Sequence, residues 1–341
     1  MRIALDATYS LGAGLSGVGV YSRELLFGLA RTDLAEDWEW FYRSQRFWRA
    51  LREQKPANVT RRLLADGWGG RGADLFHGLN QRLPKRRFRR QVATFHDLFV
   101  LSAEYSTDEF RERFAAQARE AAAGADLIIA VSEFTAGQVE QYLGVPRARI
   151  RVVHHGIPAR AIPWVKREKV VLCVGAIQRR KNQARLVRAF AALPADWRLI
   201  LAGSQGFESA ETLEAIAVSP SKERILVTGY VSDEEIGRWY GRAGIFAFPS
   251  LDEGFGMPVL EAMAAGVPVI AGNRSALPEV CGDAAVLVDP ESEDELAAAL
   301  VELAGDEARR AELVTRGRAR AAEYSWEKAV AETVSAYREL L

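Results

Sequence analysis

Short apolar runs alternate with helical patterns along almost the whole chain. One series falls at Arg2–Asp6, Trp38–Tyr42, Asp74–His77, Gln91–His96, Asp126–Val131 and Arg151–His154. A second series falls at Val170–Gly175, Arg198–Gly203, Arg224–Thr228, Ile245–Pro249, Val267–Ala271 and Ala284–Val288. Continuous apolar runs with helices between them are typical of parallel strands that are covered on both faces. The pattern therefore predicts two doubly wound α/β sheets.

Apolar residues recur at helical spacing between these runs. Helices are expected over Val18–Ala30, Ser106–Gly124, Asn182–Leu193, Ser209–Val218, Asp233–Ala243 and Gly256–Ala265. Three more helical patterns follow Pro290, and Ser325 is a good N-cap for the last of them. That helix carries an apolar stripe made of Trp326, Val330, Val334 and Tyr337. Such a stripe must dock on another element, and the first domain is one option.

A proline-containing, charged segment at Ile157–Lys169 separates the two series and is predicted to be a linker. The chain has 341 residues, which suits two domains. We predict a first domain over residues 1–160, a second over 168–325, and a terminal helix over 326–341 that returns to the first domain.

Composition narrows the class of protein. The chain is 49% hydrophobic and carries 45 Lys and Arg against 45 Asp and Glu, which argues against disorder and against nucleic-acid binding. Its two cysteines have no metal-ligand spacing. The N-terminus lacks a signal pattern, and no apolar run approaches the roughly 18 residues of a membrane helix. We therefore expect a cytoplasmic protein that touches membranes at most peripherally.

The neutral total hides an uneven distribution of charge. Residues 43–90 hold 14 Lys and Arg against 3 Asp and Glu, a net charge of +11. Arg43–Arg52 interleaves its bases with Phe47, Trp48 and Leu51, and Arg82–Arg90 has six bases in nine residues. Three interpretations stay open: an anionic membrane surface, a phosphorylated acceptor, or a solvated arginine face.

The most informative segment follows the predicted strand Ile245–Pro249. It reads EGFGMPVLEAMAAGVPVI, with Glu253 at its start and Glu261 inside the helix that it opens. A glycine-rich loop at the carboxyl end of a strand, followed by a helix N-terminus, forms an anion pocket. Two carboxylates beside it can accept hydrogen bonds from sugar hydroxyls.

This Glu-x7-Glu segment resembles that of the family-four retaining glycosyltransferases, which have the GT-B fold. The resemblance covers most of the chain and is strongest over residues 170–290. It implies two doubly wound Rossmann-like domains that face a cleft, with the terminal helix packing back on the first domain. It also implies a hexosyltransferase that moves a sugar, with retention, from a nucleotide-diphospho-sugar to a hydroxyl of a glycan or lipid-linked acceptor.

The resemblance also implies roles for residues. Glu253 would hold the donor sugar and Glu261 the ribose. The loop and helix N-terminus would bind donor sugar and phosphate through Gly254, Phe255, Gly256, Met257, Pro258, Val259 and Leu260. The loop Val174–Asn182 resembles the family's donor-phosphate loop, with Lys181 on the diphosphate. Many members have an arginine where this chain has Ala176. Arg179 and Arg180 are therefore both candidates for the second cation, and Arg180 is preferred. The alternative is that this segment is only a solvated basic turn.

The first domain offers two further candidate sites. The glycine-rich loop at Leu11–Tyr21 lacks the spacing of a dinucleotide fingerprint, and Gly17 and Gly19 are chosen as ligand-facing because bare backbone allows close approach. A flexible loop is the alternative. His96-Asp97 resembles the His-Asp of mannosyl-transferring members from bacterial surface-polysaccharide and lipopolysaccharide assembly, and favours GDP-mannose. The resemblance implies a catalytic role for His96, which would hydrogen-bond the donor sugar or assist as its charge develops. A structural histidine is the alternative for His96.

The remaining expectations concern the nucleobase and cofactors. The backbone of Tyr230 and Val231 is expected to hold the base edge. No Asp-x-Asp occurs, so neither a metal nor any other cofactor is expected, and the nucleotide-sugar is the substrate. A nucleotide-sugar epimerase and a non-catalytic nucleotide-binding protein remain as alternatives.

Overall fold

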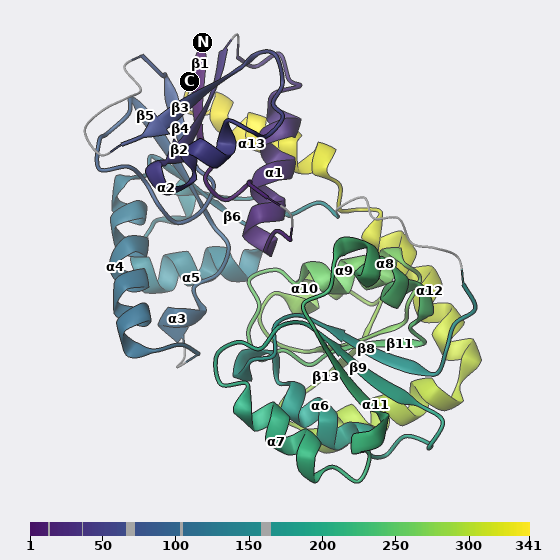
Figure 1. Ribbon diagram of the computed structural model, residues 1–341. Helices are drawn as coiled ribbons and strands as arrows, with labels where there is room; N and C mark the ends of the chain where they lie inside the picture. Colours follow the sequence, from purple (N-terminus) through teal and green to yellow (C-terminus); the bar gives the residue numbers. More distant parts are fainter. Residues whose placement is uncertain (13, 36, 66–71, 103–104, 158–164) are drawn as a thin grey trace. The chain divides into compact units, whose positions relative to one another are not determined.

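A computed structural model describes the chain except for residues 13, 36, 66–71, 103–104 and 158–164. It divides into two compact units, shown in Figure 1: unit 1 is Met1–Pro158 with Tyr324–Leu341, and unit 2 is Ala159–Glu323. Residues 158–164, which belong to the predicted linker, lie outside the described residues.

Unit 1 is built on a seven-stranded sheet in which all neighbouring strands are parallel. Its order is β3-β2-β1-β4-β5-β6-β7, so the direction of winding reverses between β1 and β4. The strands are β1 (Arg2–Asp6), β2 (Asp37–Arg43), β3 (Val59–Leu64), β4 (Leu75–Gly78), β5 (Arg90–Phe95), β6 (Leu127–Ala130) and β7 (Ile150–Val152).

Helices cover both faces of this sheet. They are α1 (Gly17–Leu29), α2 (Ser44–Ala50), α3 (Phe99–Ser102), α4 (Asp108–Gly124), α5 (Glu133–Leu143) and α13 (Trp326–Arg338). Alternate strand residues such as Leu127 and Ile128 enter different cores, one shared with α1 and α13 and the other with α4 and α5. A Cβ on Gly28 of α1 would lie 2.4 Å from Val330, so the glycine allows α13 to pack closely. The expected docking of the last helix on the first domain is confirmed.

Unit 2 repeats the architecture with a six-stranded parallel sheet of order β10-β9-β8-β11-β12-β13. Its strands are β8 (Val170–Val174), β9 (Arg198–Ala202), β10 (Ile225–Gly229), β11 (Ile245–Phe248), β12 (Val269–Gly272) and β13 (Val286–Val288). Its helices are α6 (Gln183–Phe190), α7 (Ala210–Val218), α8 (Asp233–Arg242), α9 (Met257–Ala264), α10 (Leu277–Cys281), α11 (Glu293–Gly305) and α12 (Glu307–Ala321). Figure 1 shows α6, α7 and α11 on one side of the sheet and α8, α9 and α10 on the other.

The expected α/β fold class with two parallel sheets is therefore confirmed, and every strand of both predicted series is present. Four helices and strands were not anticipated: β3, α2, α3 and α10. β3 is an edge strand in which Thr60, Arg62 and Leu63 are exposed, and α2 buries only Ala50, so neither shows an apolar period. Among the helices that the structure describes, none is long and apolar enough to cross a membrane.

Candidate functional site

The basic loop of unit 2 is held at the carboxyl end of β8. Gly175 has a φ of +139°, a conformation that favours glycine, and its N–H donates to Ala202 O at 2.9 Å. Ile177 N donates to Ser204 O at 2.8 Å, which ties the loop to the segment after β9. The chain then turns through Arg179–Lys181, a short 3-10 helix. The Lys181 side chain lies against Gly175, with Cε 3.5 Å from the position of a Cβ there.

Lys181, Arg180 and Glu253 form a compact ionic cluster. Lys181 Nζ lies 2.5 Å from Glu253 Oε1, and Arg180 Nη1 lies 3.2 Å from Glu253 Oε2. All three side chains are at most 12% exposed. Lys181 Nζ also lies 4.6 Å from the centre of the Phe248 ring, and the Glu253 N–H donates to Ser275 Oγ at 3.0 Å. The structure thus brings together residues separated by 72 positions in the sequence.

Burial and charge oppose each other in this cluster. Burial alone would raise the pKa of Glu253, but Lys181 and Arg180 outweigh it and hold that pKa below its ordinary value. Burial lowers the pKa of Lys181, and Glu253 opposes that shift. A buried carboxylate therefore stands between two cations, an arrangement suited to binding and releasing an anionic group.

Of the two candidate second cations, the structure places Arg180 beside Glu253. Arg179 instead pairs with Glu208 at 3.4 Å, and both of those side chains are exposed. Arg180 also donates to the backbone oxygen of Asp252. This hydrogen bond anchors Arg180 to the loop that connects β11 to α9.

The glycine-rich loop enters α9 through a residue in a left-handed backbone conformation that favours glycine. Gly256 has a φ of +102°, and a Cβ there would lie 2.7 Å from Leu277. Val259 N already donates to Gly256 O at 3.0 Å, and Pro258 has no N–H. A phosphate bound here would therefore contact Pro258 and Val259 through atoms other than their backbone N–H groups. The side chains of Phe255, Val259 and Leu260 are buried in the core, whereas those of Met257 and Pro258 are half-buried.

Glu261 lies in α9 and accepts a hydrogen bond from the Tyr240 hydroxyl at 2.8 Å. Tyr240 is fully buried in α8. Neither Tyr240 nor Ser275 was anticipated as part of the site, since no local pattern in the sequence links them to the two glutamates. Tyr230, expected at the nucleobase, follows β10 and is 66% exposed, and Val231 beside it is half-buried.

In unit 1, Gly17 and Gly19 occupy the first turn of α1 rather than a loop. Ser16 caps this helix by accepting from Gly19 N at 3.4 Å. A Cβ on Gly19 would lie 3.0 Å from both Tyr9 O and Leu15, so close packing explains the glycine there. Gly17 is exposed.

His96 is buried at the end of β5. Its Nε2 lies 2.9 Å from Leu79 O, and its ring meets that of Tyr21 edge to face, with centroids 4.7 Å apart. Burial lowers the pKa of His96 to about 4, so the imidazole is neutral at physiological pH. Its Nδ1 has no hydrogen-bond partner among the described residues.

A second buried histidine links β4 to the terminal helix. His77 Nδ1 lies 2.6 Å from the Tyr337 hydroxyl, and its Nε2 lies 2.8 Å from Thr94 Oγ1. Thr94 Oγ1 in turn lies 2.8 Å from the Tyr21 hydroxyl. This network explains how α13 is fixed on the sheet, and it gives His77 a structural role.

Within the described part of the chain, no three His, Cys, Asp or Glu side chains gather into a group that could hold a metal ion.

Two parallel Rossmann-like sheets, a cationic loop after β8 and a glutamate-bearing loop that enters a helix after β11 are features of GT-B glycosyltransferases. The sequence pattern described as "Glycosyltransferase Family 4" matches residues 20–160, and that of "Glycosyl transferases group 1" matches residues 159–320. The O-antigen chain mannosyltransferase B of Escherichia coli is 32% identical over 284 residues, covering 78% of this chain and 74% of that protein. The chain belongs to this family of glycosyltransferases.

One further sequence relative and one solved structure are also similar to this chain. The serotype-specific mannosyltransferase WbdA of Escherichia coli is 28% identical over 275 residues, which is 74% of this chain but only 34% of WbdA. The structure of Anabaena HepE in complex with UDP and glucose superposes with a TM-score of 0.75 at 19% identity, covering 99% of this chain and all of that one. The latter supports the fold alone.

Proposed function

We propose that this glycosyltransferase moves mannose from a nucleotide-diphospho-sugar to a hydroxyl of a glycan or lipid-linked acceptor, with retention and without a metal. The observation that carries the proposal is the buried Lys181–Glu253–Arg180 cluster. The bond from sugar to diphosphate breaks with negative charge building on the leaving phosphate, and fixed cations stabilise that charge without reorganising. Lys181 and Arg180 supply these cations, and no metal is needed for this step.

Glu253 has two functions in this proposal. Without a donor it neutralises the two cations, and with a donor bound its carboxylate accepts hydrogen bonds from sugar hydroxyls. Glu261, oriented by the Tyr240 hydroxyl, would accept from the ribose hydroxyls. The His96 imidazole, the Gly17 and Gly19 backbone, and Tyr230 and Val231 keep their proposed ligand roles as hypotheses.

The mannosyltransferase relatives support mannose as the sugar, whereas HepE was solved with UDP. Calorimetric titration with GDP, UDP, ADP and their mannose and glucose conjugates decides the donor. We expect GDP-mannose to bind most tightly. Tighter binding of a UDP-sugar would refute the donor assignment.

The catalytic assignment is tested with neighbouring arginines. Arg180→Gln and Lys181→Ala should each lower the transfer rate more than tenfold, because each removes a cation that the leaving phosphate needs. Arg179→Gln is the matched control, since its partner is the exposed Glu208. Equal effects of Arg179→Gln and Arg180→Gln would refute the assignment. Proton NMR of the product reports retention, and undiminished transfer in EDTA is the expected result for a metal-independent enzyme.

An epimerase would instead convert the nucleotide-sugar without an acceptor, and a non-catalytic binding protein would bind it without turnover. Incubation of the donor alone and with a panel of mannosides separates the three functions.

We also propose that α2 docks on an anionic membrane. Trp48 is 76% exposed and Leu51 is 48% exposed, with Arg46 and Arg49 exposed beside them. Apolar insertion and phosphate attraction would act together there. Sedimentation with phosphatidylglycerol vesicles should weaken with salt and with Trp48→Ala; binding that survives both would exclude this surface.

A further inference from the structure

The reversal of strand order in unit 1 marks a place where a ligand can bind. From β1 the chain winds outward to β2 and β3, and it then crosses back to place β4 on the other side of β1. The loops after β1 and β4 therefore diverge and leave a crevice at the carboxyl edge of the sheet. A cavity of about 800 Å³ lies there, lined by Tyr9 from the first loop and by Asn80, Gln81 and Arg82 from the second. Helix α4 forms its other wall.

The second loop contributes two largely buried amide side chains to the lining of this cavity. Asn80 and Gln81 are each only 8% exposed, and their side-chain oxygens have no hydrogen-bond partner among the described residues. Buried amide oxygens are normally paired, so two unpaired ones in residues that line a cavity favour a ligand that supplies donors once their side chains turn toward it. Hydroxyl groups of a saccharide are such donors.

The loop that carries these amides is held rigidly. Leu79 O contacts His96, Gln81 O accepts from Gln117 Nε2 at 3.1 Å, and Arg82 N donates to Asn80 O at 2.7 Å. Gly78 before it has no room for a side chain, because a Cβ would lie 2.2 Å from Arg82 O. The backbone of the loop is thus fixed, and the amide side chains are the part that can turn into the cavity.

A second cavity of about 510 Å³ adjoins the first and shares Arg82, Gln117 and Glu120 with it, and among the described residues Glu120 is the one acidic residue that lines either cavity. Four basic side chains line it, and two of them are neutralised: Arg43 lies 3.7 Å from Asp6, and Arg87 lies 2.8 Å from Asp126. The other two, Arg82 and Lys85, have no ion pair among the described residues. Among the described residues, the Arg82 guanidinium donates to the Tyr9 hydroxyl alone, at 3.3 Å.

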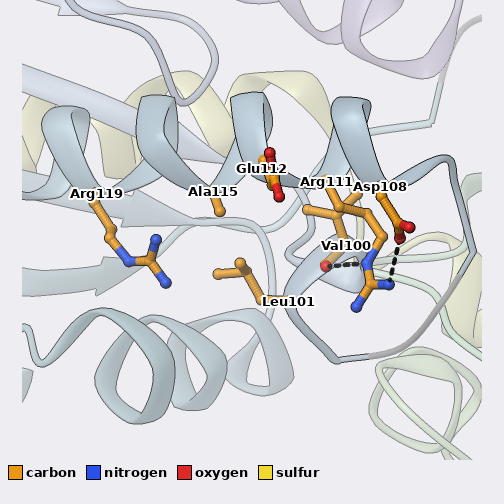
Figure 2. A pocket seen from close by; sticks show the side chains of 7 residues that line it. All are labelled: Val100, Leu101, Asp108, Arg111, Glu112, Ala115 and Arg119. Carbon is orange, nitrogen blue, oxygen red and sulfur yellow. Dashed lines mark hydrogen bonds and ion pairs between the residues drawn. The ribbon is translucent and has the colours of Figure 1, made fainter.

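A third cavity, of about 490 Å³, shows that this charge is local. Figure 2 shows it beside α4, where Asp108 and Glu112 accompany Arg111 and Arg119. There Arg111 binds Asp108 Oδ1 and Val100 O, both at 3.4 Å. Cationic and anionic side chains are equal in number at this cavity, unlike at the pair beside β1 and β4.

We propose that the two adjoining cavities of unit 1 bind an acceptor that carries a phosphate group: Tyr9, Asn80 and Gln81 receive its saccharide hydroxyls, and Arg82 and Lys85 receive its phosphate. This inference rests on the proposed transfer to a hydroxyl acceptor and narrows the acceptor to an anionic saccharide. The phosphate belongs either to a soluble sugar phosphate or to a lipid phosphodiester, and both present the same group to Arg82.

Calorimetry with three probes tests this: methyl α-mannoside, mannose 1-phosphate, and the farnesyl ester of mannose 1-phosphate. We expect mannose 1-phosphate to bind at least tenfold more tightly than the methyl glycoside. Arg82→Gln and Lys85→Gln should remove most of that difference, and Arg82→Lys should restore part of it. Arg119→Gln, at the third cavity of Figure 2, is the control and should leave it unchanged.

Asn80→Ala should weaken all three probes to the same degree, because it acts on the saccharide. Tighter binding of the farnesyl ester identifies a lipid-linked acceptor, and equal binding identifies a soluble one. Equal affinity for neutral and phosphorylated mannose, or equal effects of Arg82→Gln and Arg119→Gln, would overturn the inference. Titration of the same variants with GDP-mannose keeps the two proposals apart: donor binding without a phosphate preference refutes only this one.

Discussion

Unit 1 should lose stability steeply as the pH falls from 8 to 5, whereas unit 2 should not. All four histidines of the chain are in unit 1. Burial lowers the pKa of His77 to about 3 and that of His96 to about 4, and it holds the pKa of His155 well below its ordinary value. The folded unit keeps these rings neutral at a pH where the unfolded chain protonates them.

The sign and size follow from proton linkage. A histidine whose pKa is depressed by folding contributes no penalty above the unfolded pKa of about 6.5, and the penalty grows as the pH falls until the folded pKa is reached. At pH 5, His77 and His96 should each reduce the free energy of unfolding by about 2 kcal/mol relative to pH 8. Together they remove about 4 kcal/mol, and His155 acts in the same direction. Domains are stable by only ~5–15 kcal/mol, so the effect is large.

Hydrogen exchange followed by mass spectrometry between pH 5 and 8, corrected for intrinsic exchange rates, resolves the two units within one sample. Protection should fall in β4, β5 and α13 while β8 and β11 serve as the internal control. The variant His77→Gln should flatten the dependence by about 2 kcal/mol over this range. Unchanged protection of unit 1 at pH 5, or the same slope in His77→Gln, would refute the reasoning.

Three further predictions concern unit 2. Glu253→Gln should lower the free energy of unfolding by ~3–5 kcal/mol, because it leaves two buried cations without their carboxylate. Lys181→Met should lower it less. If urea unfolding gives the reverse order, the ionic cluster is not arranged as described. Gly256→Ala should cost about 1–3 kcal/mol, because its φ of +102° is strained for alanine, and an unchanged melting temperature would contradict that geometry. Tyr240→Phe should cost about 1 kcal/mol and weaken nucleotide binding, because Glu261 loses its donor; calorimetry that finds wild-type affinity would remove Glu261 from the ribose site.

The strands and the two glutamates of the site were predictable from the sequence because each is marked by a local pattern. Each buried parallel strand is a continuous apolar run, and Glu253 and Glu261 stand in one loop-and-helix segment. The pairing of Lys181 with Glu253 was not predictable, since it depends on how β8 and β11 lie side by side. Tyr240 was equally hidden, because a buried tyrosine in a helix gives no sign that its hydroxyl reaches a carboxylate on another helix.

The basic stretch at residues 43–90 shows most clearly what could not be predicted from the sequence. Arg82, Lys85 and Arg87 are equivalent members of one cationic run in the sequence, yet among the residues that the structure describes only Arg87 of these three has an acidic partner, Asp126. That partner lies 39 positions away, so the sequence alone could not separate the neutralised base from the two that face a cavity. The helix α2 escaped prediction for a related reason: its exposed residues have no apolar period, and only Ala50 is buried.

The return of α13 to unit 1 has a consequence for synthesis on the ribosome. The face of α1 that carries Leu25 and Leu29 shares its core with Val330 and Val334, which are translated some 300 residues later. Unit 2 can therefore complete its core while unit 1 still exposes an apolar groove to solvent and chaperones. A chain released after Glu323 should keep the unfolding transition of unit 2 and lose that of unit 1. Unit 1 can therefore complete its fold only after Tyr324–Leu341 have emerged from the ribosome.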